Sequence, residues 1–166
     1  AGGLGVLTAF AQAPYYFLPL LVIGFSGLIW LVDQAFRAQK PARHVFFLGW
    51  WFAFGYIYLG IYWLAFSFFH NAAGPVHFAV LAAIGFLGVA AAAGFIALFY
   101  GAALLIAFRF WHSGWIRIFA FAVFWSLAEY VRGHILTGFP WNLTGQAFAG
   151  FPVLSQLAAL IGPYGL

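Results

Sequence analysis

The chain has 166 residues, of which 67% are hydrophobic and 5% are charged. Soluble domains usually contain about 45–50% apolar residues, so this composition excludes an ordinary soluble protein and predicts a polytopic helical membrane protein. Six Lys and Arg residues against two Asp and Glu residues give a net charge of +4, but most of these cations lie in short loops, so we expect no nucleic-acid partner.

Apolar runs of the length that a bilayer requires, about 20 residues each, follow one another along the chain. We expect an all-α transmembrane helical bundle with about five spans and the start of a sixth, forming one domain over residues 1–166. The predicted spans cover residues 1–12 (incomplete), 16–32, 45–69, 78–108 and 116–136, and a truncated element begins near residue 153. The run at 78–108 is longer than a bilayer needs, so it should tilt or protrude. Because the chain begins and ends inside apolar runs, we interpret it as a fragment.

The charge pattern predicts the orientation of these spans. Five of the six cations lie in two loops, at 33–44 and 109–117, which two spans separate and which therefore share one side. The positive-inside rule places both loops in the cytoplasm, and the segments 70–77 and Thr137–Pro152, which contain no Lys or Arg, on the opposite side. Tryptophans near the predicted cytoplasmic ends are expected to be interfacial anchors, and these are Trp30, Trp50, Trp51, Trp111 and Trp115.

A pair of charges interrupts the last complete span. Glu129 and Arg132 are three residues apart, so they share a helix face and can pair. A lone charge at the bilayer centre costs about 2.5–3.5 kcal/mol on insertion scales, so neither should face lipid unpaired. Two interpretations are open: a salt bridge that locks the helix, or the polar lining of an outward-opening cavity in which Arg132 meets a phosphate.

The segment Thr137-Gly138-Phe139-Pro140-Trp141-Asn142 follows this pair. Because glycine permits unusual dihedrals and proline ends a helix, the segment predicts a turn at the outer surface. The turn is either a helix terminator with one interfacial tryptophan, or a lipid access site with Phe139 and Trp141 as its apolar wall. The candidate substrate-binding residues are Glu129, Arg132, Phe139, Pro140, Trp141 and Asn142. The histidines have no partner at metal-ligand spacing and no nucleotide loop is present, so we expect neither a metal nor a cofactor.

Several motifs occur together in this chain: Gly60-Ile61-Tyr62-Trp63-Leu64, Glu129-Tyr130-Val131-Arg132-Gly133, the Thr137–Asn142 segment and Ile161-Gly162-Pro163-Tyr164-Gly165-Leu166. They resemble the membrane portion of bacterial apolipoprotein N-acyltransferase. The resemblance spans nearly the whole chain, and the Thr-Gly-Phe-Pro-Trp block is its most specific part.

The resemblance implies an inner-membrane acyltransferase that moves an acyl chain from a phospholipid to the N-terminal amine of an S-diacylglyceryl cysteine in a lipoprotein. It also implies a periplasmic nitrilase-like domain with a Glu-Lys-Cys triad. Since the 166 residues contain no cysteine, we assign no catalytic residue and expect the fragment alone to be inactive. The implied partners are the phospholipid donor, the diacylglyceryl lipoprotein acceptor and membrane lipids, which the helices would position. The segment Thr137–Pro152 would then face the periplasm.

Two alternatives of other classes are a small transporter or channel subunit, with Glu129 and Arg132 as an intramembrane relay, and a structural membrane subunit. A relay predicts ionisable residues in several spans, whereas the spans at 45–69 and 78–108 contain none in their interiors. A downstream soluble domain with a cysteine, a lysine and a glutamate would discriminate between the three.

Overall fold

The computed structural model describes residues 1–70, 72, 74–112, 114–136 and 138–166. Every regular element in these residues is a helix, which confirms the predicted all-α class. The α-helices are α1 (Gly2–Ala9), α2 (Pro19–Arg37), α3 (Ala42–Ile61), α4 (Phe66–Phe69), α5 (Pro75–Ala107), α6 (Ile116–His134), α7 (Pro152–Ser155) and α8 (Ala158–Ile161). The 3₁₀ helices are η1 (Tyr62–Ala65), η2 (Phe108–Phe110) and η3 (Thr144–Gly150).

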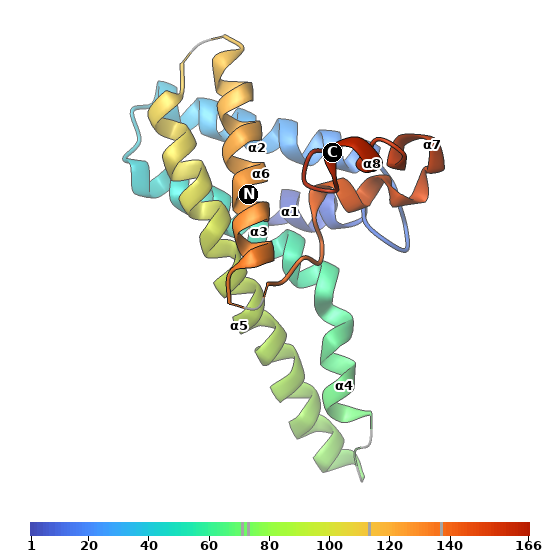
Figure 1. Ribbon diagram of the computed structural model, residues 1–166. Coiled ribbons are helices and arrows are strands. Elements are labelled where there is room, and N and C mark those ends of the chain that lie inside the picture. Colours follow the sequence, from blue (N-terminus) through green and yellow to red (C-terminus); the bar gives the residue numbers. More distant parts are fainter. Residues whose placement is uncertain (71, 73, 113, 137) are drawn as a thin grey trace.

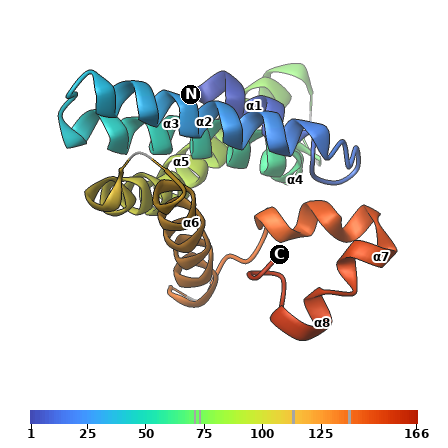
Figure 2. The ribbon, with the colours of Figure 1, turned by 90° about the horizontal axis from the view of Figure 1, so that it is seen from above.

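Helix α3 is the centre of the bundle. It contacts α1 and α2 on one side and α5 on the other, and α6 packs against α5 (Figure 1). After α6 the chain continues as an arc of short helices that ends with α7 and α8 (Figure 2). Gly5 of α1 and Gly55 of α3 let these two helices approach closely, because a Cβ at either would collide with a backbone carbonyl of the other helix.

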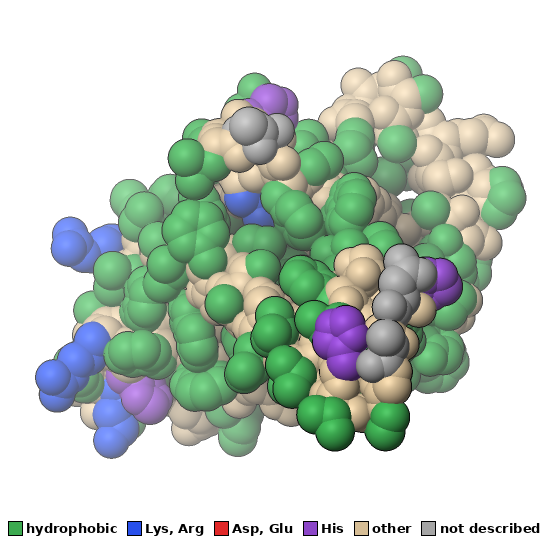
Figure 3. Space-filling view, turned by 90° about the horizontal axis from the view of Figure 1, so that it is seen from below, with side chains coloured by type: hydrophobic (Ala, Val, Ile, Leu, Met, Phe, Trp, Pro, Cys, Tyr) green, Lys and Arg blue, Asp and Glu red, His purple; other side chains and the backbone are tan. Residues whose placement is uncertain are grey.

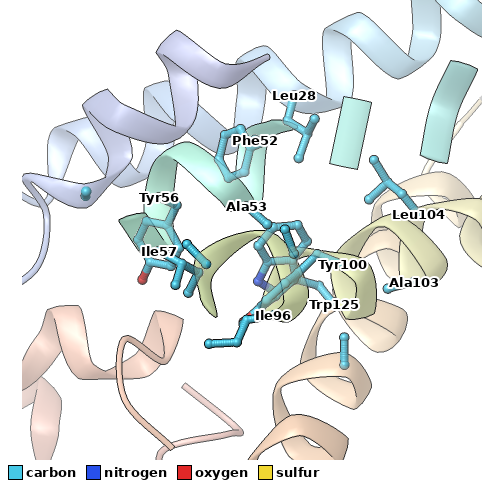
Figure 4. Close-up of a cluster of buried hydrophobic side chains, with 14 of the residues drawn as sticks. Leu28, Phe52, Ala53, Tyr56, Ile57, Ile96, Tyr100, Ala103, Leu104 and Trp125 are labelled. Atoms are coloured by element: carbon cyan, nitrogen blue, oxygen red, sulfur yellow. The ribbon is translucent and has the colours of Figure 1, made fainter. Parts of the chain in front are cut away.

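The hydrophobic core lies where α2, α3, α5 and α6 meet. Phe52, Tyr56 and Tyr100 are fully buried, and the ring of Trp125 lies 4.4 Å from that of Tyr100 (Figure 4). These aromatic side chains supply a large apolar area, and the hydroxyl of Tyr100 needs a hydrogen-bond partner inside the bundle. The hydroxyl of Tyr100 therefore lies inside the core, beside the face of α6 that contains Glu129.

Among the described residues, three helical segments are long and apolar enough to cross a membrane: Pro19–Arg37, Ala42–Phe69 and Pro75–Phe110. The number of about five spans stays a prediction, because α1 has only 8 residues and α6 carries three charges within its 19 residues. At 33 residues, or about 50 Å at 1.5 Å per residue, α5 is longer than a hydrocarbon core of about 30 Å, as its sequence predicted.

The second predicted span is displaced along the chain relative to α2. Pro19 lies in the first turn of α2, where its missing N–H is tolerated, so the helix begins three residues after the predicted start at 16. The helix continues to Arg37, five residues beyond the predicted end at 32. A cation in the last turn interacts favourably with the helix dipole, so the polar end of α2 stays helical instead of joining the loop.

The cytoplasmic end predicted from the charges holds a polar cluster of its own. Figure 3 shows most of the visible Lys and Arg side chains gathered along one edge of the face viewed from below, and many hydrophobic side chains over the rest, among histidines and other groups. Trp111 is only 1% exposed and donates its indole N–H to Asp33 Oδ1 at 2.9 Å. Its assignment as an interfacial anchor is wrong, because its indole joins two elements inside the protein. Trp30 and Trp115 are exposed, and their role as anchors stays a prediction.

Candidate functional site

The chain leaves helical geometry directly after α6. That helix ends at His134, and Leu136, Gly138 and Asn142 then adopt positive φ values of 51°, 80° and 54°. Thr137 lies outside the described residues. Residues 138–143, called the turn from here on, join α6 to η3 without regular structure, as the Gly-Phe-Pro pattern predicted.

Arg132 lies beneath the turn and is 2% exposed. Its Nη1 donates to the carbonyl of Phe139 at 2.7 Å and its Nη2 to the carbonyl of Asn142 at 3.0 Å. Its Nε donates to the hydroxyl of Tyr100 at 2.8 Å. The planar guanidinium thus holds two carbonyl groups of the turn and one side chain of α5 at once, which a lysine cannot do with the same geometry.

Glu129 is also 2% exposed and holds the start of η3. Its Oε1 accepts hydrogen bonds from the backbone N–H and from the hydroxyl of Thr144, both at 2.8 Å. Trp125 donates its indole N–H to the same hydroxyl at 3.1 Å. Glu129 therefore ties the C-terminal part of α6 to the segment that follows the turn.

Glu129 and Arg132 share one site, but they do not form the salt bridge that was one of the two interpretations of the pair. Within the described part of the chain, no ion pair joins them. Tyr100 lies between them, since its hydroxyl accepts from Arg132 Nε and donates to Glu129 Oε1 at 3.4 Å. Of the two open interpretations, the direct salt bridge is therefore absent from the described residues, because Arg132 binds carbonyls of the turn and Glu129 binds Thr144. A contact between Arg132 and a lipid phosphate stays a prediction.

Two amides complete the support of the turn from other directions. Gln12, 5% exposed and beyond the end of α1, donates to the carbonyl of Leu143 at 2.9 Å and to the hydroxyl of Tyr56. Gln146 donates to the carbonyl of Pro140 at 2.9 Å and accepts from the backbone N–H of Leu143 at 3.1 Å. Irregular backbone away from water needs protein groups that satisfy its N–H and C=O groups, and these side chains do so.

The outer surface of the turn is aromatic. Trp141 is 45% exposed, and its ring lies 5.3 Å from that of Phe139 and 5.5 Å from that of Trp63. Phe139 and Arg132 also line a pocket of about 210 Å³ between α5 and the end of α6, whose other walls are apolar. The turn thus presents an aromatic surface and an apolar pocket above a buried charged cluster.

A comparison with known protein families shows which family the chain matches. The model of the apolipoprotein N-acyltransferase N-terminal domain matches residues 4–166. The chain belongs to this family.

Relatives named apolipoprotein N-acyltransferase are similar to the chain over nearly all of it. The protein of Caulobacter vibrioides is 43% identical over 163 residues, which cover 98% of this chain and 29% of that protein. The proteins of Brucella melitensis and Rhodopseudomonas palustris are 37% and 36% identical, cover 98% of this chain each, and are themselves covered to 30% and 29%. The chain spans less than a third of the length of these relatives.

All six predicted site residues fall within the part matched by the apolipoprotein N-acyltransferase domain, and the structure brings them together at the turn. Glu129 and Arg132 lie beneath it, and Phe139, Pro140, Trp141 and Asn142 form it. The polar partners that sequence reasoning missed are Gln12, Tyr100, Thr144 and Gln146. One signal was available for Gln12, because it is the only amide side chain in the first predicted span.

Proposed function

We propose that this chain is the membrane domain of an enzyme that transfers an acyl chain from a phospholipid to the N-terminal amine of an S-diacylglyceryl cysteine in lipoproteins. In this proposal the domain binds the lipid substrates and holds them in register with a reactive thiol. The 166 residues contain no cysteine, so that thiol belongs to residues outside them. Holding reactants in a productive geometry can contribute several kcal/mol to a rate enhancement. Membership of the apolipoprotein N-acyltransferase family supports the reaction class.

The observation that carries the proposal is the turn itself. A half-exposed tryptophan and an apolar pocket lie directly above two buried charged residues, Glu129 and Arg132. Acyl chains need apolar walls, and an indole offers a large rigid surface with one hydrogen-bond donor near headgroup level. We assign Phe139 and Trp141 to the wall that contacts lipid. Glu129 and Arg132 hold the turn in place, with Pro140 and Asn142 as part of its backbone.

Acyl transfer by purified full-length enzyme to a diacylglyceryl lipopeptide tests this assignment. Trp141→Ala removes the exposed indole, so we expect weaker use of one or both lipid substrates at unchanged thermal stability. Trp141→Phe keeps most of the apolar area and should do less harm. Trp115→Ala is the matched control, because Trp115 is 77% exposed at the other end of α6. Kinetics of Trp141→Ala equal to those of Trp115→Ala would overturn the proposal.

The proposal also requires the turn to face the periplasm from the inner membrane. Most of the cations lie in the loops at 33–44 and 109–117, which the positive-inside rule places in the cytoplasm. Lys40 and Ala149 are both exposed, so cysteines placed there report the two sides. In intact cells, a membrane-impermeant thiol reagent should label Ala149→Cys and spare Lys40→Cys, with the parent enzyme as the background. The reverse pattern would place the turn in the cytoplasm.

A further inference from the structure

A second pocket borders the turn and shares no lining residue with the pocket that Arg132 lines. It has a volume of about 310 Å³ and lies between the α1–α2 connection, the end of α3 and η3. Its lining includes no Lys, Arg, Asp or Glu. The polar side chains that line it are neutral, and they are Gln12, Tyr16, Trp63, Asn142 and Gln146.

One of the three amides of this pocket has a nitrogen without a partner among the described residues. Gln12 and Gln146 donate to carbonyl groups of the turn, so their hydrogen bonds are structural. The Nδ2 atom of Asn142 is buried and has no acceptor in the part of the chain that the structure describes. Buried donors are almost always paired in proteins, so an unpaired one beside a pocket is available to donate to a bound ligand.

Gly60 makes room for this unpaired amide. The Asn142 amide packs against Gly60, and a Cβ at that position would collide with it. Asn142 itself has a φ of 54°, a conformation that asparagine tolerates better than most residues. Its χ2 torsion has a broad energy minimum, so the amide can turn its N–H groups into the pocket while the backbone stays in place.

The chemistry of the pocket selects an uncharged acceptor. A phosphate or carboxylate would enter without a cation to compensate it, which is costly in a low-dielectric setting. A neutral ester carbonyl accepts one hydrogen bond and carries no charge. Trp63 is 48% exposed in the same wall and lies against Trp141, so apolar surface is available for the acyl chain that continues from such a carbonyl.

We propose that this pocket binds an ester carbonyl of a glycerolipid through the side-chain amide of Asn142. This proposal rests on one part of the proposed function, which is that this surface of the domain binds lipid. It adds a contact that recognises the ester linkage, in a pocket separate from the one that Arg132 lines.

Two lipids that differ only in this linkage test the proposal. One is phosphatidylglycerol with two ester-linked oleoyl chains, and the other is phosphatidylglycerol with two ether-linked oleyl chains, which has no carbonyl. The protein is the full-length enzyme in detergent with its thiols alkylated, so that neither lipid can react and both act as ligands. The site itself is unaffected, because these 166 residues contain no cysteine. The melting temperature as a function of lipid content gives an apparent affinity for each lipid.

We expect the ester lipid to bind about fivefold more tightly than the ether lipid, which is the effect of one neutral hydrogen bond. Gly60→Ala displaces the Asn142 amide and should abolish this preference. Gly88→Ala is the matched control, because a Cβ at Gly88 of α5 would meet no atom within 4 Å. Asn142→Asp keeps the size of the side chain but replaces its donor, so it should also abolish the preference.

Each contrary result has a distinct meaning. Equal affinity of the unsubstituted enzyme for both lipids would overturn this proposal and leave the proposed function standing. An ester preference that persists in both Gly60→Ala and Asn142→Asp would overturn the assignment to this pocket. If neither lipid raises the melting temperature, lipid binding by the domain fails, and the proposed function fails with it.

Discussion

The two ends of α6 each carry a polar cluster, and the clusters differ in what they hold. Near its start, Arg117 Nε lies 3.4 Å from Asp33 Oδ1, and these side chains are 27% and 15% exposed. Twelve residues later, or about 18 Å along the helix, Glu129 and Arg132 are both 2% exposed. The first cluster joins side chains of different elements, whereas the second satisfies backbone groups of an irregular segment.

This difference predicts that the two clusters contribute unequally to the free energy of unfolding. Ion pairs with partial exposure contribute about 0–1 kcal/mol, because water screens them and ordering the side chains offsets the attraction. A buried charge that loses its partners costs several kcal/mol, and so does each backbone group left unsatisfied in a membrane. The cluster beneath the turn should therefore dominate the stability of this domain, although both clusters contain one acidic residue, one arginine and an aromatic donor.

The largest expected effect belongs to Arg132→Ala. The substitution leaves the carbonyls of Phe139 and Asn142 and the hydroxyl of Tyr100 without a donor, so we expect a loss of about 3–5 kcal/mol in the free energy of unfolding. Denaturant unfolding of the full-length enzyme in detergent measures it. Arg117→Ala, at the other end of the same helix, is the control and should lose less than about 1 kcal/mol. Equal losses would remove the distinction between the clusters.

An intermediate effect is expected for Tyr100→Phe. The ring and its packing against Trp125 are kept, but the hydroxyl that links Arg132 to Glu129 is lost, which should lower the free energy of unfolding by about 1–3 kcal/mol. The control is Tyr58→Phe, because the hydroxyl of Tyr58 has no hydrogen-bond partner in the part of the chain that the structure describes. If both variants unfold like the unsubstituted enzyme, Tyr100 does not link the two charges.

The smallest effect should come from Asp33→Asn. The amide oxygen still accepts the indole N–H of Trp111, so only the attraction to Arg117 is lost, worth less than about 1 kcal/mol. Because salt screens exposed charges, the difference from the unsubstituted enzyme should shrink further at about 1 M salt. Thermal unfolding at low and high salt measures both quantities. A large loss that is independent of salt would show that this pair is as isolated from water as the one beneath the turn.

Local signals in the sequence were enough to locate the functional candidate. Two charges inside an apolar run are rare, and a Gly-Phe-Pro pattern directly after them ends the helix, so Glu129, Arg132 and the turn could be predicted. Their hydrogen-bond partners could not. Tyr100 lies 32 residues before Arg132 in a run without charges, where one more tyrosine carries no distinguishing signal.

Composition and the order of apolar runs determined the all-α class, the family resemblance and the position of the turn, because each of these depends on residues that are close in the sequence. Only the tertiary structure decided that Tyr100 separates Glu129 from Arg132, that Gln12 supports the turn, and that Trp111 is buried instead of interfacial. The physical reason is that a buried polar group takes whichever partner the packed helices bring within about 3 Å. That choice depends on how α1, α3, α5 and α6 approach one another, which no local pattern encodes.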